Sequence, residues 1–348
     1  MTVLPALSRI PAGLTARRAW PHADGLAVEA TTDEGTVVGL VVTDDQVRTL
    51  TPADPALPAL GPALAEPGSV LLGHRPGRRA VLREAGGHYR KIVRPDRSHK
   101  VADGLRQARE RLRGVTGAPQ VPIVLAAEPG WVRLAALPGP SLNVLLANAP
   151  DDAVAFCARV SVALAALLRA PVHDLTRHTA SDEVAVLRRW TADADAACAI
   201  GLSAATEPVA AALLALPTPQ WAVCHRDLHD KQLIAIASRP DGGSAVGLLD
   251  LDTLAAADPA LDAGNLLAHL HLRTLRGHCA PDVATRCARA LIGGELGAAL
   301  EPTALRIHTA AALLRLAGVY TFRPGQRDLP TRLAALATDV LSSSRRNA

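Results

Sequence analysis

The chain has 348 residues, of which 49% are apolar, and a formal net charge of +4 at pH 7. This length and apolar content suit a globular protein with more than one buried core and exclude a disordered chain. The basic residues are spread along the chain and the aromatic residues are few (two Phe, two Tyr and four Trp), which argues against a nucleic-acid-binding surface.

The cysteines are odd in number and show no C-x-x-C spacing. Neither a disulfide framework nor a zinc ribbon is therefore indicated. The N-terminal segment has no basic start followed by a sustained apolar run, and no run reaches the ~18 apolar residues that a membrane span needs. We expect a soluble, cytoplasmic protein that does not act at a membrane.

Near the N-terminus, residues 25–43 predict two strands, because apolar β-branched residues flank a turn at Asp33, Glu34 and Gly35. The following segment, 51–68, is rich in proline and predicts an extended connector. We expect residues 1–67 to form a small β cap with this connector, separate from the rest of the chain.

From Gly68 the pattern of apolar runs and turns predicts a small antiparallel sheet. One amphipathic helix, expected at 98–113, is inserted into it. The expected strands cover residues 69–73, 78–84, 88–94, 121–127 and 131–137. We expect residues 68–137 to form one lobe, with the sheet as its centre.

After residue 137 the chain is dominated by long Ala- and Leu-rich helices, with three short strands between them. The helices are expected at roughly 151–170, 180–200, 204–216 and from about 260 to the end. Residues 138–348 therefore predict a second, helical lobe. The fold class is α+β and bilobal, and the cleft between the lobes is the expected site.

A dense polar cluster, "CHRDLHDKQ", occupies residues 224–232. A metal site could use His225 and His229, but Arg226 between them would repel a divalent cation. A nucleophilic pair could use Cys224 and His225, but adjacent strand residues point to opposite faces. Cys224 is more typical of a small buried side chain.

The third interpretation is a phosphoryl-transfer loop with the pattern H-x-D-x-x-x-x-[N/Q]. His225, Asp227 and Gln232 fit it, and Asp250 ends the nearby strand "VGLLD". Phosphoryl transfer needs a carboxylate that orients the acceptor hydroxyl and oxygen ligands for Mg²⁺. With "YRKIVR", "LAALPGPSL", "LLDLD" and "ADPALDAGNLLAHL" in order between about 68 and 275, the chain resembles the aminoglycoside phosphotransferase and choline kinase group, which has the protein-kinase-like fold.

The resemblance implies a role for each matching residue. Asp227 would be the catalytic carboxylate. Gln232 and Asp250 would bind Mg²⁺, and Asp252 would be a further acid beside the metal. Lys91 would contact the phosphates of ATP, although a lysine extending to solvent from a sheet edge also fits its place.

Other assignments by resemblance are open. Leu137, in the hinge-like segment, would lie beside the nucleotide. Glu110 would pair with Lys91, but it lies opposite the apolar stripe of its helix, where an ordinary solvated residue fits equally well. Arg75, in the turn "GHRPGRR", would contact phosphate, but a plain hairpin turn explains it too. Asp258 and Asp262 are expected to brace the catalytic loop or cap the next helix.

The expected function is ATP- and Mg²⁺-dependent phosphorylation of a small-molecule hydroxyl. Gln232 in place of the commoner Asn is similar to maltokinase-like sugar kinases, which favours a sugar, an amino sugar or a related secondary metabolite. Residues 253–348 hold seven acidic and eleven basic side chains, so we expect a neutral or weakly charged acceptor and not a polycationic aminoglycoside. The alternatives are a Ser/Thr kinase of a biosynthetic precursor peptide and a nucleotide-binding pseudokinase.

Overall fold

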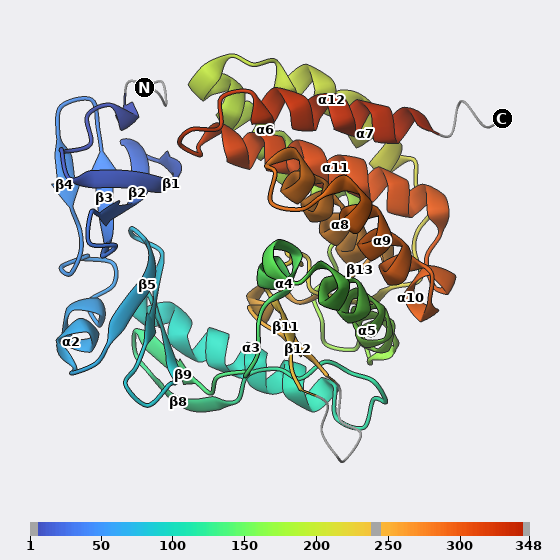
Figure 1. Ribbon diagram of the computed structural model, residues 1–348, viewed down its shortest axis with the longest axis horizontal. Coiled ribbons are helices and arrows are strands. Elements are labelled where there is room, and N and C mark those ends of the chain that lie inside the picture. Colours follow the sequence, from blue (N-terminus) through green and yellow to red (C-terminus); the bar gives the residue numbers. More distant parts are fainter. Residues whose placement is uncertain (1–5, 238–244, 344–348) are drawn as a thin grey trace.

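The computed structural model describes residues 6–237 and 245–343. Strands gather in the N-terminal part of the chain and helices form most of the rest (Figure 1). This arrangement confirms the predicted α+β class. No helix of the described residues is long and apolar enough to cross a membrane.

The N-terminal cap is a four-stranded antiparallel sheet in the order β1-β2-β3-β4. The predicted strands and their turn are present, but the sheet also contains β1 and β4, which the sequence analysis missed. Polar residues alternate with apolar ones in β1, and Arg17 forms a bulge that interrupts its register. The strands are β1 (Leu14–His22), β2 (Gly25–Thr32), β3 (Val37–Val42) and β4 (Val47–Thr49).

The connector is not extended throughout, because it contains the short helix α2 (Leu60–Ala65). Leu57 and Leu60 are fully buried against the next sheet, and this burial outweighs the proline content of the segment. Pro62 lies in the first turn of the helix, where a backbone N–H has no intrahelical partner in any case.

The second sheet has five strands in the order β5-β6-β7-β9-β8. Its central strand, β7, pairs with β6 and β9, so Lys91 lies in the middle of the sheet and not at an edge. The predicted helix is α3 (Ser98–Arg111), inserted between β7 and β8. The strands are β5 (Val70–Arg75), β6 (Arg79–Arg83), β7 (Tyr89–Val93), β8 (Val124–Glu128) and β9 (Trp131–Leu134).

The C-terminal part is helical, with two short antiparallel strand pairs, β10 with β13 and β11 with β12. These pairs position the polar loops between the helices. The expected continuation of helix to the chain end falls partly on residues 344–348, outside the described residues. The elements are α4 (Leu142–Asn148), α5 (Pro150–Arg169), α6 (Ala180–Cys198), α7 (Leu202–Leu214), β10 (Ala222–Cys224), β11 (Leu233–Ala235), β12 (Val246–Leu248), β13 (Ala255–Ala257), α8 (Ala260–Leu275), α9 (Pro281–Ile292), α10 (Glu295–Ala298), α11 (Pro302–Thr321) and α12 (Leu329–Ser342).

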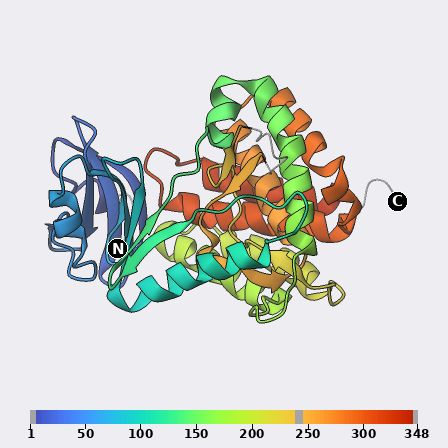
Figure 2. The same ribbon diagram turned by 90° about the horizontal axis from the view of Figure 1, so that it is seen from below.

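The cap touches both of the other parts and is not a detached unit. Figure 2 shows the two sheets together at one end of the molecule and the helices at the other. The backbone N–H of His74 in β5 donates to Oε2 of Glu29 in β2 at 2.9 Å. The N–H of Ala19 in β1 donates to the carbonyl of Phe322, after α11, at 3.1 Å. The cap therefore bridges the sheet lobe and the helical lobe.

Candidate active site

The polar cluster forms the loop between β10 and β11. Cys224 ends β10 fully buried, and burial raises the pKa of its thiol well above the usual value. A buried thiol with a raised pKa is not a nucleophile, so the expectation of a small buried residue is confirmed. Among the described residues, no three or more His, Cys, Asp or Glu side chains are grouped as metal ligands, and Cys224, His225 and His229 form no such group.

Asp262, near the start of α8, fixes the backbone of this loop. Its carboxylate accepts the N–H of His225 at 2.6 Å and the N–H of Arg226 at 2.7 Å. Arg226 has φ +72°, a conformation that favours glycine. The two hydrogen bonds offset the cost of an arginine in this conformation. The predicted bracing role of Asp262 is confirmed.

His225 joins the loop to the strand that precedes Asp250. Its Nε2 lies 2.8 Å from the carbonyl oxygen of Leu249, and a carbonyl can only accept, so Nε2 carries the proton. His225 is fully buried. It is therefore a structural tie between the two acidic segments of the site.

Asp227 follows with its side chain half exposed. One oxygen lies 3.7 Å from Nη1 of Arg315 in α11. Arg315 also donates to Oδ1 of Asn265 at 2.6 Å, and Asn265 donates to the carbonyl of Arg226 at 3.0 Å. These contacts hold the loop against α8 and α11 while leaving the Asp227 carboxylate accessible.

Asp250 and Asp252 meet the lysine of the sheet lobe. Nζ of Lys91 lies 2.7 Å from Oδ1 of Asp250 and 2.5 Å from Oδ2 of Asp252, and Nη1 of Arg79 lies 3.3 Å from Asp250. Burial opposes ionisation of Asp250, but the charges of Lys91 and Arg79 outweigh it and hold the pKa of Asp250 well below its usual value. Two carboxylates that face one cation are an oxygen donor set that suits Mg²⁺.

Gln232 is buried, not on the surface as a glutamine without a role would be. Its Oε1 accepts the N–H of His229 at 3.2 Å, and its backbone carbonyl accepts the N–H of Leu249 at 2.9 Å. Gln232 lines the same cavity as Asp250 and Asp252, and an amide oxygen is a neutral hard donor of the kind that Mg²⁺ accepts. The residues present therefore fit a magnesium ion.

Glu110 does not pair with Lys91. It is exposed on α3 and forms an ion pair with Arg113 at 2.6 Å. The reason is the helix period, which turns Glu110 away from the buried stripe of Val101, Leu105 and Ala108. The open alternative of an ordinary solvated residue is correct.

The turn between β5 and β6 satisfies its own backbone groups. Gly77 donates its N–H to Asp54 at 2.7 Å, and Arg78 donates its N–H to the carbonyl of Arg75 at 3.0 Å. The Arg75 guanidinium lies 5.2 Å from the ring centre of Trp20. The sequence analysis missed Arg79, the residue of this turn that reaches Asp250.

One cavity of about 850 Å³ collects nearly all of the predicted site residues. Glu110 is the exception. Those that line the cavity are Arg75, Lys91, Leu137, Asp227, Gln232, Asp250 and Asp252.

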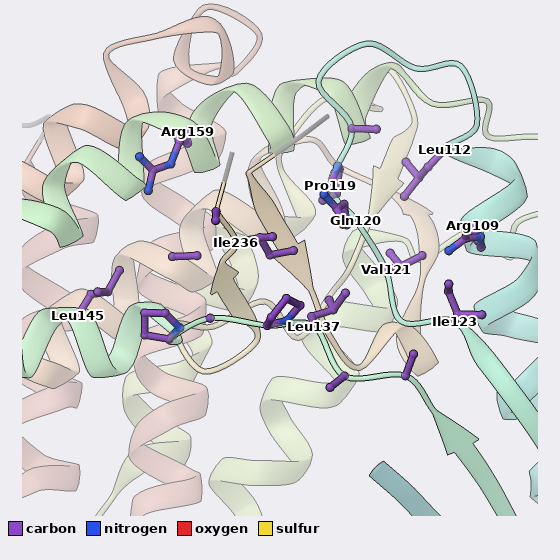
Figure 3. A pocket seen from close by; sticks show the side chains of 18 of the residues that line it. Arg109, Leu112, Pro119, Gln120, Val121, Ile123, Leu137, Leu145, Arg159 and Ile236 are labelled. Carbon is purple, nitrogen blue, oxygen red and sulfur yellow. The ribbon is translucent and has the colours of Figure 1, made fainter. Parts of the chain in front are cut away.

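A larger cavity of about 1290 Å³ lies beside the hinge segment that contains Leu137. Its lining is mainly apolar, with Leu112, Ile123 and Ile236 among the labelled side chains in Figure 3. Leu137 belongs to both cavities, but the predicted catalytic and metal-binding residues line only the smaller one. The smaller cavity is therefore the candidate site for the predicted chemistry.

Residues 75–286 match the family model described as "Phosphotransferase enzyme family". This segment is more than half of the chain and contains the Lys91, Asp227 and Asp250 described above. The chain belongs to this family. The predicted resemblance and the predicted class of enzyme, a phosphotransferase, are confirmed with it.

Solved structures of the same fold are similar to the chain at low identity. Aminoglycoside 2'-phosphotransferase IIIa in a GDP complex has a TM-score of 0.51 at 13% identity, covering 84% of this chain and 96% of that one. Aminoglycoside-3'-phosphotransferase of type VIII has a TM-score of 0.50 at 19% identity, covering 75% and 98%. A glucosamine kinase has a TM-score of 0.47 at 19% identity, covering 98% and 97%. The first two confirm the bilobal kinase-like fold. In a separate comparison, no curated protein matches the chain.

Proposed function

We propose that the protein is an ATP- and Mg²⁺-dependent kinase that phosphorylates a hydroxyl of a small molecule, such as a sugar, an amino sugar or a related secondary metabolite. One observation carries the proposal. The accessible carboxylate of Asp227 lines the same cavity as Lys91, Asp250 and Asp252. Phosphoryl transfer needs a carboxylate for the acceptor hydroxyl and a cationic, metal-binding site for the triphosphate in one cavity.

Each residue has a chemical task in this proposal. Asp227 accepts a hydrogen bond from the acceptor hydroxyl and aims its oxygen at the γ-phosphorus. A bond forms between the hydroxyl oxygen and the γ-phosphorus while the bond from the γ-phosphorus to the bridging oxygen breaks. ADP leaves, and the hydroxyl proton passes to Asp227. Asp250, Asp252 and Gln232 would hold the magnesium ion, which would neutralise phosphate charge. Lys91 aligns the phosphates once they replace its present carboxylate partners.

Apolar side chains from both lobes support a site for the nucleotide base. Val81 and Leu134 come from the sheet lobe, Leu137 from the hinge, and Ile234 and Leu249 from the helical lobe, and all five line the cavity. A flat base between two apolar walls is a common way to bind a nucleotide. The base would then point its phosphates toward Lys91 and Asp250.

The test is Mg²⁺-dependent ADP release over a library of hydroxyl compounds, with precursor-type peptides as a second arm. We expect acceptor-dependent ADP release from small molecules and none from the Asp227→Asn variant. ADP release with peptides but with no small molecule would mean that the acceptor is a peptide. Nucleotide binding without turnover on any acceptor would indicate a pseudokinase and reject the proposal.

A further inference from the structure

We propose that the acceptor carries an anionic group, a phosphate or a carboxylate, besides the hydroxyl that is phosphorylated. This inference rests on the proposed function and names the chemical class of its acceptor. The observation behind it is that one part of the cavity wall is basic. This part is formed by β1, the catalytic loop, α8, α11 and the segment after α11.

In this part of the wall, which we call the basic wall, the charged side chains are mostly cations. Among the described residues that line it, Glu29 is the only acid besides Asp227. Its cations are Arg17, Arg18, Lys231, Arg273, Arg276, Arg315 and Arg323.

The carboxylates near the basic wall are already paired. Each carboxylate contacts one arginine and neutralises one positive charge. No negative charge remains to neutralise the other cations. The pairs are Arg18 with Glu29 at 3.2 Å, Arg273 with the buried Asp230 at 2.6 Å, and Arg315 with Asp227 at 3.7 Å.

Arg17, Lys231, Arg276 and Arg323 remain. No carboxylate of the described part of the chain lies within ion-pair distance of them. Aromatic rings hold two of these arginines: Arg276 lies 5.6 Å from the ring centre of Tyr320, and Arg323 lies 5.2 Å from that of Trp20. Ring contacts orient a guanidinium without neutralising its charge.

The surroundings of the basic wall lower the pKa of Arg323. Burial and the charge of Arg18 lower it to about 10. A bound anion would relieve this effect, because it favours the charged form.

The arrangement excludes a polycationic acceptor and refines the expectation of a neutral one. An aminoglycoside would add positive charge to a wall that already has too much. Arginine forks match the oxygens of phosphate and carboxylate groups. The donor phosphates do not account for these cations, since Lys91 and Arg79 serve that side and come from the sheet lobe.

The first test is direct binding of inorganic phosphate, measured by calorimetry with and without saturating Mg²⁺ and a nonhydrolysable ATP analogue. With the nucleotide bound, we expect phosphate still to bind, and to bind at least ~10-fold more weakly to Arg276→Gln and Lys231→Gln variants. Arg332→Gln, on the exposed face of α12, is the matched control and should bind as the wild type does. Lys231 lines the cavity and takes part in none of the ion pairs of the described residues, so its variant should fold even if Arg276→Gln does not.

Two results of this titration would overturn the inference. One is the absence of phosphate binding to the nucleotide-saturated wild type. The other is binding that neither variant weakens.

The second test separates this inference from the proposed function. Matched acceptors that differ only in a phosphate, a carboxylate, an amine or none of these are compared for binding and for ADP release. We expect tighter binding and higher kcat/KM for the anionic members, and the better of the two anions identifies the group. A neutral or cationic acceptor used as efficiently would overturn the inference and keep the kinase. Anion binding without ADP release would keep the inference and reject the kinase.

Discussion

The two sides of the cavity differ in how their charges are arranged. On the donor side, Lys91 contacts Asp250 at 2.7 Å and Asp252 at 2.5 Å, so opposite charges neutralise each other. On the basic wall, Lys231, Arg276 and Arg323 face the cavity without an acid of their own. The donor side is balanced and must exchange partners to bind a nucleotide, whereas the basic wall is ready for an anion.

The two sides also differ in their relation to the family. Every predicted catalytic and metal-binding residue lies within the matched segment, 75–286. The basic wall draws on Lys231, Arg273 and Arg276 inside that segment, and on Arg17, Arg18, Arg315 and Arg323 outside it. The basic wall therefore extends beyond the part of the chain that the family match covers.

The largest expected effect is that of Asp227→Asn, which should leave nucleotide binding intact. The carboxylate acts on the acceptor in the transition state, so kcat should fall by ~10² or more. Steady-state kinetics and a nucleotide titration measure the two quantities. Turnover at the wild-type rate in a pure preparation would remove Asp227 from the catalytic role.

Asp250→Asn should raise the Mg²⁺ concentration needed for half-maximal turnover by ~10-fold or more, because a hard anionic ligand is lost. Lys91→Met should instead weaken nucleotide use at unchanged magnesium dependence. Magnesium titrations of kcat for both variants separate the two roles. Identical magnesium curves for Asp250→Asn and the wild type would contradict a metal site at this strand end.

Gln232 offers a matched series on the same side. Asn moves the amide oxygen back by about one bond length, ~1.5 Å, and Ala removes it. We expect Gln232→Asn to be impaired and Gln232→Ala more so, with partial rescue of both by excess Mg²⁺. Because Gln232 also accepts the N–H of His229, a loss of kcat without a magnesium shift would mean that it only braces the loop.

On the basic wall, loss of solvent and the charge of Arg273 lower the pKa of Lys231 to about 8, which predicts a pH dependence. The ammonium attracts an anion, so kcat/KM for an anionic acceptor should be highest below pH 8 and fall several-fold as the pH rises through it. Lys231→Arg should keep the profile flat, because a guanidinium stays charged. A falling limb that persists in Lys231→Arg would assign the titration to another group.

The smallest effect concerns the loop that joins the two sides. At φ +72°, Arg226→Gly should be more stable than Arg226→Ala by up to about 1 kcal/mol, since both lose the guanidinium and only Ala keeps the strain. Urea unfolding midpoints of the two variants measure the difference. Equal midpoints would show that Asp262 alone dictates this backbone conformation.

Much of the donor side could be predicted from sequence, because its signals are local. The spacing from His225 to Gln232, the strand end at Asp250 and the lysine in the middle of a strand are patterns within short segments. The backbone converts such spacings directly into neighbouring positions. Even here Arg79 was missed, since nothing in the turn distinguishes it from Arg75 and Arg78.

By itself, the sequence determined the α+β division, the order of the motifs and the loop built around Asp227. Tertiary structure decided which charges meet. Lys91 contacts Asp250 and not Glu110. The helix period turns Glu110 toward solvent, and the chain fold brings the end of the strand before Asp250 close to Lys91. The basic wall likewise joins β1 to α11, about 300 residues apart in the chain. Such contacts depend on how whole elements pack, and no short sequence pattern records that packing.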